Sequence, residues 1–366
     1  MTAPVRSRLS IAFDMTFPNR NAGGSGVYAR SLLSELQQRS ELQLYEISGP
    51  NSGGLPGTLR WLLFGCHEET LRRGADLLHC PAFVAPWRSP IPLVITMHDA
   101  GAMRFPGDFP REWRLYNRYI LPGIARKARV IITGTETSRS ELARYYGIST
   151  NRIAVTHYGI DSRYHQKLDT TQVASERDRL SGGAPMLLFI GAPVSRKNLD
   201  IVLQAMSGAP PESVLSQVKL VISGASEEQF PHYRDWIAEH RLQRRVIWLG
   251  RVASDRMPLL YAASDAVVYP SFYEGFGLPP LEAMAVGTPV IASTAACLPE
   301  VLGNAALLVD PNDHRGFAEA VMAALMRPEL RARMVTEGKT RAAQYTWERC
   351  AEETCNVYRT VLGLEC

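Results

Sequence analysis

The feature that most constrains the fold is a repeated alternation of short apolar segments with longer segments of helical pattern. In the second half of the chain, the apolar segments are residues 186–190, 220–223, 246–249 and 266–269. Predicted helices such as 199–206 and 258–263 lie between them. Strands that alternate with helices form parallel sheets. The helix carries the chain back to the end of the sheet at which the previous strand began, so the next strand runs in the same direction. The sequence therefore predicts an α/β fold.

The length of the chain favours two domains. A chain of 366 residues exceeds one comfortable hydrophobic core, so two domains of roughly 150 to 200 residues are expected. A polar stretch that ends in Ser181-Gly-Gly-Ala184 predicts a linker between them. We predict an N-terminal domain, a linker, a C-terminal domain and a final helix, at residues 1–165, 166–184, 185–345 and 346–366.

Charge is distributed unevenly along a chain whose net charge is only +4. Residues 1–165 carry 20 Lys and Arg against 13 Asp and Glu, whereas residues 166–366 carry 20 against 23. The N-terminal half is therefore the side expected to meet an anionic partner, although a solvated basic face explains the charge equally well.

The six cysteines indicate a reducing compartment. They form no Cys-x-x-Cys pair and have no histidine at metal-ligand spacing, which argues against a zinc site and a disulfide framework. No signal peptide pattern or run of 18 apolar residues is present. We expect a cytoplasmic protein, soluble or attached peripherally to a membrane.

Polar residues follow two predicted strands of the first half. His98 and Asp99 come directly after the apolar segment 92–97, and ligands of parallel sheets bind at the carboxyl ends of strands. Gly23 and Gly24 lie between the predicted strand 8–13 and a helix, where a phosphate or a hydroxyl could bind. A structural histidine and a plain tight turn are the alternatives.

Two adjacent cations follow the first strand of the second half. Arg196 and Lys197 lie in Gly191-Ala-Pro-Val-Ser-Arg-Lys-Asn198. Arginine offers a planar fork of donors and lysine a compact charge, which together suit a diphosphate. Solvated basic residues on a loop would have the same composition.

Residues 269–293 form the densest candidate site. Glu274 and Glu282 are separated by seven residues, with Glu274 in a predicted loop and Glu282 in a predicted helix. Between them, Gly275-Phe276-Gly277-Leu278 brings backbone N–H groups to a surface beside a helix N-terminus, which suits anions and polar ligands.

The segment Phe272-Tyr-Glu-Gly-Phe-Gly-Leu-Pro-Pro-Leu-Glu-Ala-Met-Ala285 resembles the hallmark of the family-four nucleotide-sugar glycosyltransferases. The resemblance extends over nearly the whole chain. It implies the GT-B fold, in which two Rossmann-like domains face each other across a cleft and a C-terminal helix packs back on the first domain.

The resemblance also implies roles for individual residues. It assigns the donor sugar to His98, the donor diphosphate to Arg196 and Lys197, the transferred sugar to Glu274 and the nucleotide ribose to Glu282. Gly23 and Gly24 would lie near the diphosphate and the acceptor. The chain departs from the family at Tyr158, where asparagine is usual, and at Thr135, where serine is usual.

The implied function is retaining transfer of a hexose from a nucleotide sugar to a glycan or lipid-linked sugar in surface polysaccharide synthesis. We favour mannose from GDP-mannose, with glucose or a related hexose from another nucleotide as the alternative donor. Alternatives are a nucleotide-sugar 2-epimerase and a non-catalytic nucleotide-sugar-binding subunit. We expect no cofactor besides the nucleotide sugar, no metal and no nucleic acid, since the chain contains no Asp-x-Asp motif. The basic, aromatic residues 111–129 suit the inner face of the plasma membrane or a packed helix with solvated arginines.

Overall fold

The computed structural model describes residues 8–21, 23–50, 57–58 and 60–364. The chain divides into two compact units, which we describe separately. Unit 1 contains residues 1–159 and 345–366, and unit 2 contains residues 160–344.

Unit 1 has a sheet of six parallel strands among its described residues, in the order β2-β1-β3-β4-β5-β6. The strands are β1 (Leu9–Asp14), β2 (Leu42–Ile47), β3 (Leu77–Cys80), β4 (Leu93–Thr96), β5 (Val130–Thr133) and β6 (Ile153–Val155). In the register, Ile11 of β1 lies opposite Leu44 on one side and Leu77 on the other.

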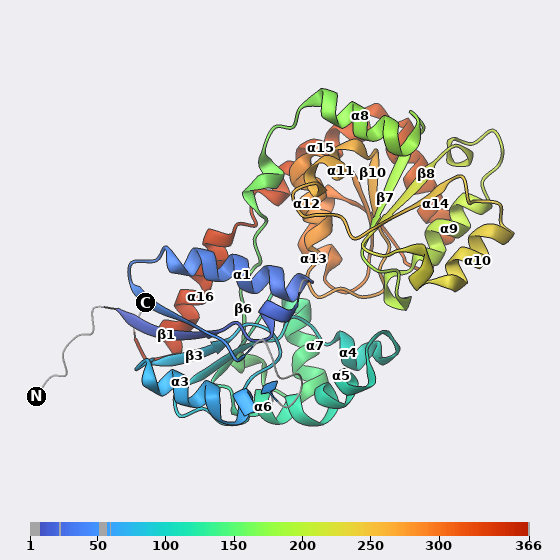
Figure 1. Cartoon of the computed structure of the whole chain (residues 1–366). Coiled ribbons are helices and arrows are strands. Elements are labelled where there is room, and N and C mark those ends of the chain that lie inside the picture. Colours follow the sequence, from blue (N-terminus) through green and yellow to red (C-terminus); the bar gives the residue numbers. More distant parts are fainter. Residues whose placement is uncertain (1–7, 22, 51–56, 59, 365–366) are drawn as a thin grey trace, which may run out of the picture. The chain divides into compact units, whose positions relative to one another are not determined.

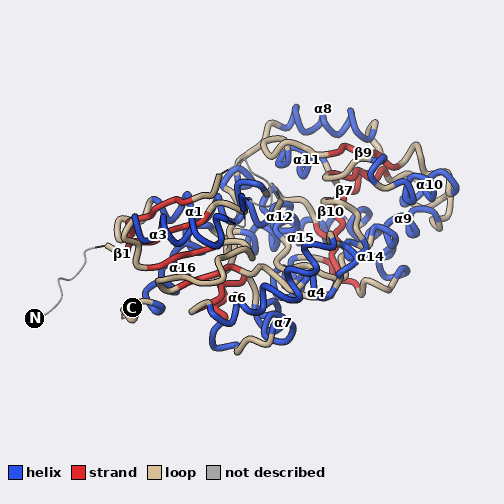
Figure 2. Tube along the Cα trace, turned by 60° about the horizontal axis from the view of Figure 1, so that its bottom comes forward, coloured by secondary structure: helices blue, strands red, loops and turns tan. Residues whose placement is uncertain are grey.

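Helices cover both faces of this sheet because its strands bury side chains on both sides. The α-helices are α1 (Gly24–Gln37), α3 (Cys66–Arg72), α4 (Gly101–Arg104), α5 (Arg111–Leu115), α6 (Leu121–Lys127), α7 (Glu136–Tyr146) and α16 (Trp347–Val361). One face packs on α6 and α7, through Ile95 and Ile131 among others. In unit 1, α16 lies beside α1 (Figures 1 and 2).

Unit 2 also has a sheet of six parallel strands among its described residues, in the order β12-β11-β10-β7-β8-β9. The strands are β7 (Met186–Ile190), β8 (Lys219–Ser223), β9 (Val246–Gly250), β10 (Ala266–Tyr269), β11 (Val290–Ser293) and β12 (Leu307–Val309). This is the order of a Rossmann sheet, with β7 as its first strand. The predicted α/β fold is confirmed.

The helices of unit 2 lie in two groups on either side of its sheet (Figure 1). They are α8 (Thr170–Ser181), α9 (Leu199–Ser207), α10 (Pro231–Glu239), α11 (Met257–Ala263), α12 (Leu278–Val286), α13 (Leu298–Leu302), α14 (His314–Met326) and α15 (Pro328–Ala342). Alternate strand residues such as Leu187 and Phe189 pack with α9 and α14 in one core. The contacts of α11 with α8 and of α12 with α15 hold the other group together.

The structure corrects the predicted linker at 166–184. Residues 170–181 form α8, which packs on α11 and belongs to unit 2. Arg177 on this helix forms an ion pair with Asp265, with Nη2 2.6 Å from Oδ2. The polar composition that indicated a linker is that of a helix with one exposed face. The change of unit falls earlier, between Gly159 and Ile160.

The basic segment 111–129 is mostly helical. It consists of α5, a π-helical turn at Tyr116–Ile120 and α6. No helix in the described ranges is long and apolar enough to cross a membrane.

Candidate active site

The strand order of unit 2 reverses at β7. From β7 the chain proceeds to β8 and β9 on one side of the sheet and to β10, β11 and β12 on the other. Loops diverge at the carboxyl ends of the strands beside such a reversal, where open α/β sheets bind ligands. The segments that hold Lys197 and Glu274 follow β7 and β10, so both predicted donor-binding segments leave the sheet at this point.

Glycines allow tight turns of the backbone at the carboxyl ends of three adjacent strands of unit 2. Gly191, Gly224 and Gly250 follow or end β7, β8 and β9, and all have positive φ angles, of 105°, 114° and 64°. A Cβ on Gly224 would lie 2.9 Å from the Cα of Gly191, closer than real contacts allow. Neither Gly224 nor Gly250 was predicted as a site residue, although each follows an apolar run.

Lys197 is the central cation of the site. It ends a 3-10 turn, Ser195–Lys197, and its side chain is only 11% exposed. Its Nζ lies 2.7 Å from Oε1 of Glu274 and donates to the hydroxyl of Tyr269 over 2.8 Å. Burial lowers the pKa of Lys197, and the charge of Glu274 acts against this shift. The buried ammonium therefore depends on Glu274 as its counter-charge.

Arg196 adds a second cation to the same carboxylate. Its Nη1 lies 3.5 Å from Oε1 of Glu274, and Ser271 donates to that oxygen over 2.8 Å. Burial raises the pKa of Glu274, but the charges of Lys197 and Arg196 outweigh it and hold that pKa below its ordinary value. Two cations thus surround one ionised carboxylate, and the group keeps a net positive charge that can attract a diphosphate.

A fixed backbone holds this group together. The amide N–H of Phe272 donates to the carbonyl of Arg196 over 2.7 Å, which ties the loop after β10 to the loop after β7. Asn198 is left-handed, with a φ of 55°, and its Nδ2 donates to the carbonyls of Pro270 and Pro311 over 3.1 and 2.8 Å. Asn198 therefore positions the two cations beside it.

Glu282 belongs to a different hydrogen-bond network. Helix α12 begins at Leu278, so Glu282 lies one turn inside it. The hydroxyl of Tyr261 donates to Oε2 of Glu282 over 2.7 Å, and Tyr164 forms a second hydrogen bond to the carboxylate. Burial raises the pKa of Glu282 against these two bonds. Neither tyrosine was predicted as a partner of Glu282.

The glycine-rich loop between the two glutamates is mostly buried. Gly275, Phe276 and Gly277 are buried, and Leu278 is partly exposed. Gly277 has a φ of 96°, and a Cβ there would lie 3.0 Å from Leu298. The glycine is needed for this turn, which brings the N-terminus of α12 to the carboxyl end of β10.

In unit 1, His98 follows β4 in a buried aromatic environment. The imidazole is 8% exposed, and its Nδ1 lies 2.8 Å from the hydroxyl of Tyr158. Burial lowers the pKa of His98 to about 3 against the effect of the Pro81 carbonyl, so the ring is neutral. Asp99 accepts a hydrogen bond from the N–H of Gly101 over 2.7 Å, which gives it a role in the turn before α4.

Gly23 and Gly24 begin α1, and both are exposed. A Cβ on Gly24 would meet no atom within 4 Å, whereas one on Gly26 would lie 1.8 Å from the carbonyl oxygen of Asn21. Gly26 is therefore required by the fold. Gly24 leaves the helix N-terminus open to a ligand.

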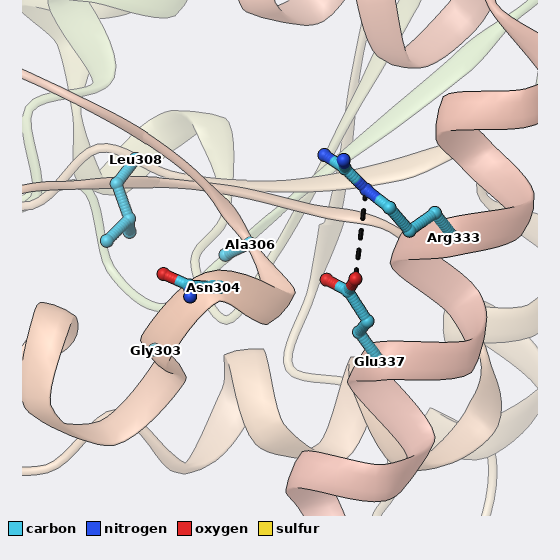
Figure 3. A pocket seen from close by; sticks show the side chains of 6 residues that line it. All are labelled: Gly303, Asn304, Ala306, Leu308, Arg333 and Glu337. Atoms are coloured by element: carbon cyan, nitrogen blue, oxygen red, sulfur yellow. Dashed lines mark ion pairs between the residues drawn. The ribbon is translucent and has the colours of Figure 1, made fainter.

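A separate hollow of unit 2 lies between β12 and the side of α15 (Figure 3). It is lined by Gly303, Asn304, Ala306, Leu308, Arg333 and Glu337. Its two charged side chains form a long ion pair, with Nε of Arg333 3.8 Å from Oε1 of Glu337. None of the predicted site residues lines this hollow.

Two family descriptions match most of the chain. Residues 172–341 match the family described as Glycosyl transferases group 1, and residues 22–164 match Glycosyltransferase Family 4. The O-antigen chain mannosyltransferase B of Escherichia coli is 32% identical over 291 residues, which cover 77% of this chain and 74% of that protein. A D-inositol 3-phosphate glycosyltransferase of Acidothermus cellulolyticus is 30% identical over 295 residues, covering 76% of this chain and 64% of that protein.

Solved structures show the same fold at low sequence identity. Sucrose-phosphate synthase of Thermosynechococcus elongatus superposes with a TM-score of 0.79 at 21% identity, covering 97% of this chain and all of that one. HepE of Anabaena, in complex with UDP and glucose, superposes with a TM-score of 0.76 at 19% identity, covering 96% of this chain and all of that one. The chain therefore belongs to the family-four glycosyltransferases of the GT-B fold.

Proposed function

We propose that this glycosyltransferase is a retaining, metal-independent hexosyltransferase that transfers mannose from GDP-mannose to a glycan or lipid-linked sugar in surface polysaccharide synthesis. The observation that carries the proposal is the group of Lys197, Arg196 and Glu274 at the strand reversal of unit 2. The choice of mannose and of a surface glycan rests on the similarity to O-antigen chain mannosyltransferase B.

The two cations of unit 2 suit the leaving group of such a transfer. Negative charge grows on the diphosphate as the glycosidic bond lengthens, and fixed cations in a partly dry site stabilise that charge. Lys197 and Arg196 are held before any ligand binds, by Glu274 and by the backbone of Tyr273. These side chains then need to move little as charge develops on the diphosphate. A divalent metal would only provide positive charge that the two cations already provide.

The two glutamates support binding roles instead of a covalent mechanism. A retaining glycosidase uses two carboxyl groups about 5 Å apart as nucleophile and acid. Here the Glu274 carboxylate is paired with Lys197, which makes it a weak nucleophile, while Glu282 is held by Tyr261 and Tyr164. We assign Glu274 to the hydroxyls of the transferred sugar and Glu282 to the ribose. An oxygen of the leaving diphosphate would then take the acceptor proton on the same face of the sugar.

In unit 1 the neutral imidazole of His98 suits a hydroxyl, and the open N-terminus of α1 suits a phosphate. We assign His98 to the donor sugar, Asp99 to a supporting contact, and Gly23 and Gly24 to the diphosphate and the acceptor. These assignments rest on the family resemblance, on the neutral state of His98 and on the open N-terminus of α1.

An exposed basic and apolar surface on unit 1 suits a lipid-linked acceptor. Along α5 and the π-helical turn, Leu115, Tyr119 and Ile120 are 46%, 68% and 46% exposed. Arg114 and Arg118 are exposed beside them. Cations that surround exposed apolar side chains bind anionic membrane surfaces. We propose that this surface contacts the inner face of the plasma membrane.

The test is a panel of nucleotide sugars, including GDP-mannose, UDP-glucose and UDP-N-acetylglucosamine, scored first by thermal shift. A ligand that binds only the folded protein raises the melting temperature with its concentration. The stabilising donor is then incubated with an acceptor, and the anomeric configuration of the product is read by NMR. We expect GDP-mannose to stabilise the protein and the product to keep the donor's α configuration.

Three outcomes would contradict parts of the proposal. Conversion of the donor to its 2-epimer without an acceptor would indicate an epimerase. Binding without any product across the panel of donors and acceptors would indicate a binding subunit. A product of inverted configuration would contradict retention.

A further inference from the structure

Tyr158 is a buried tyrosine of unit 1 that lies beside His98. It lies in the segment after β6, is 3% exposed and directs its hydroxyl to Nδ1 of His98, 2.8 Å away. Its ring also packs on Tyr28, with centroids 4.5 Å apart. The orientation of this hydroxyl is therefore fixed by packing as well as by its hydrogen bond.

The other ring nitrogen of His98 has no hydrogen bond. Nε2 is buried and makes no hydrogen bond of normal geometry to the described residues, although the Pro81 carbonyl lies near enough to raise the pKa of the imidazole against burial. The rings of Tyr28 and Phe83 lie against the imidazole edge to face, at centroid distances of 4.9 and 5.2 Å. A buried polar atom without a hydrogen bond destabilises the protein, so a ligand oxygen that met Nε2 would recover that stabilisation.

The hydrogen bond at Nδ1 decides what Nε2 can offer. A neutral imidazole carries one proton, and the partner of one nitrogen fixes whether the other donates or accepts. A phenolic hydroxyl that donates to Nδ1 leaves the proton on Nε2. His98 then has a single N–H donor, at Nε2, which makes no hydrogen bond of normal geometry to the described residues.

We propose that Tyr158 is a positioning residue, whose hydroxyl donates to Nδ1 of His98 and thereby holds the neutral imidazole with its proton on Nε2, ready to donate to an oxygen of the transferred sugar. The identity of the substrate rests on the proposed function, whereas the tautomer of His98 is a property of the protein alone. Phe83 is the partly exposed ring of the two beside His98 and has a left-handed backbone, with a φ of 51°.

The experiment compares Tyr158→Phe with Tyr146→Phe, His98→Gln and the double variant Tyr158→Phe/His98→Gln. Tyr146→Phe is the matched control, because Tyr146 is also buried in unit 1 and donates its hydroxyl to Asn117 over 2.8 Å, with no contact to His98. Long-range ¹H–¹⁵N spectra of histidine-labelled protein report the tautomer, and His98→Gln assigns the signal. GDP release from GDP-mannose, or release of the nucleotide from whichever donor stabilises the wild type, reports turnover.

We expect the spectra of the wild type to show His98 as one tautomer, with Nδ1 unprotonated and Nε2 protonated. In Tyr158→Phe we expect a mixture of the two tautomers. Tyr158→Phe should lower kcat about tenfold with little change in donor KM, whereas Tyr146→Phe should leave both unchanged. In the His98→Gln background, Tyr158→Phe should have no further effect, because the two residues act as a unit.

Three results would overturn the proposal: a wild-type His98 protonated at Nδ1, a Tyr158→Phe variant with wild-type kcat, or full additivity of the two substitutions. If no donor in the panel turned over, the proposed function would fail, yet the tautomer would still be read from the spectra. The two failures are thus distinguishable.

Discussion

The two units bury polar groups of opposite kinds at the carboxyl ends of their sheets. In unit 2, Lys197 and Glu274 are charged and paired, and each shifts the pKa of the other toward the charged form. In unit 1, burial lowers the pKa of His98 and of His79 to about 3, so both imidazoles are neutral. Charged groups suit a diphosphate and neutral groups suit sugar hydroxyls, and our proposal therefore assigns the two regions to different parts of the donor.

The largest expected effect comes from Glu274→Gln. The substitution leaves Lys197 buried without its counter-charge, so we expect a loss of about 3 kcal/mol of stability and a fall in turnover of about 100-fold or more. The pKa of Lys197, already lowered by burial, should fall further. Residual donor affinity should then decline, as pH rises, at a lower pH than in the wild type. Calorimetric titration of the donor across pH measures this.

Glu282→Gln is the matched control for that variant. An amide oxygen can still accept from Tyr261, so stability should change little while nucleotide affinity falls. The assigned roles of the two glutamates are wrong if Glu274→Gln loses its affinity for GDP while Glu282→Gln binds GDP like the wild type.

A second pair of variants separates fold from function at the start of α1. Gly24→Val should keep the melting temperature close to wild type, because a Cβ at Gly24 meets no atom within 4 Å. Turnover should fall about tenfold if a ligand uses the open helix N-terminus. Gly26→Ala should instead destabilise the protein, because its Cβ would clash with the Asn21 carbonyl. Wild-type turnover in Gly24→Val would remove this loop from the site.

A smaller effect is expected at the exposed surface of α5 and the π-helical turn. Arg114→Glu/Arg118→Glu should weaken binding to phosphatidylglycerol vesicles, since each arginine near an anionic surface contributes about 1 kcal/mol. Arg315→Glu, on the exposed face of α14 in unit 2, is the control. Cosedimentation with phosphatidylglycerol and phosphatidylcholine vesicles distinguishes charge-dependent binding. Equal binding by all three proteins would argue against this surface.

The smallest expected effect is that of a chelator. Since Lys197 and Arg196 already provide positive charge for the diphosphate, turnover after exhaustive treatment with EDTA should equal that of the untreated enzyme. Activity that is abolished by EDTA and restored by Mg²⁺ or Mn²⁺ would contradict metal independence.

Periodicity and family resemblance predicted the α/β architecture and brought Arg196, Lys197 and Glu274 into one site. Strand ends could be predicted because apolar runs stop where Gly or Pro follows, as after Ile190 and Tyr269. The linker was mistaken because a polar helix such as α8 has the composition of a loop. That residues 170–181 belong to unit 2 becomes evident only from the packing of α8 on α11.

The partners of the site residues could not be predicted, because they are far away in sequence. The hydroxyl of Tyr158 meets His98 across 60 positions, and that of Tyr261 meets Glu282 across 21. Nothing in the local pattern of either tyrosine shows where its hydroxyl will lie. Gly224 was missed for the same reason, since the close approach that requires a glycine is to Gly191 on the neighbouring strand.

The most direct test of the assignment of unit 2 to the donor is calorimetric titration of GDP into the wild type, Lys197→Ala, Arg196→Ala and His98→Gln. If another donor stabilises the wild type, its nucleoside diphosphate replaces GDP. We expect Lys197→Ala to weaken binding at least tenfold, Arg196→Ala to weaken it less, and His98→Gln to bind like the wild type. Wild-type affinity in Lys197→Ala, or loss of affinity confined to His98→Gln, would contradict the assignment of the diphosphate to the charged group of unit 2.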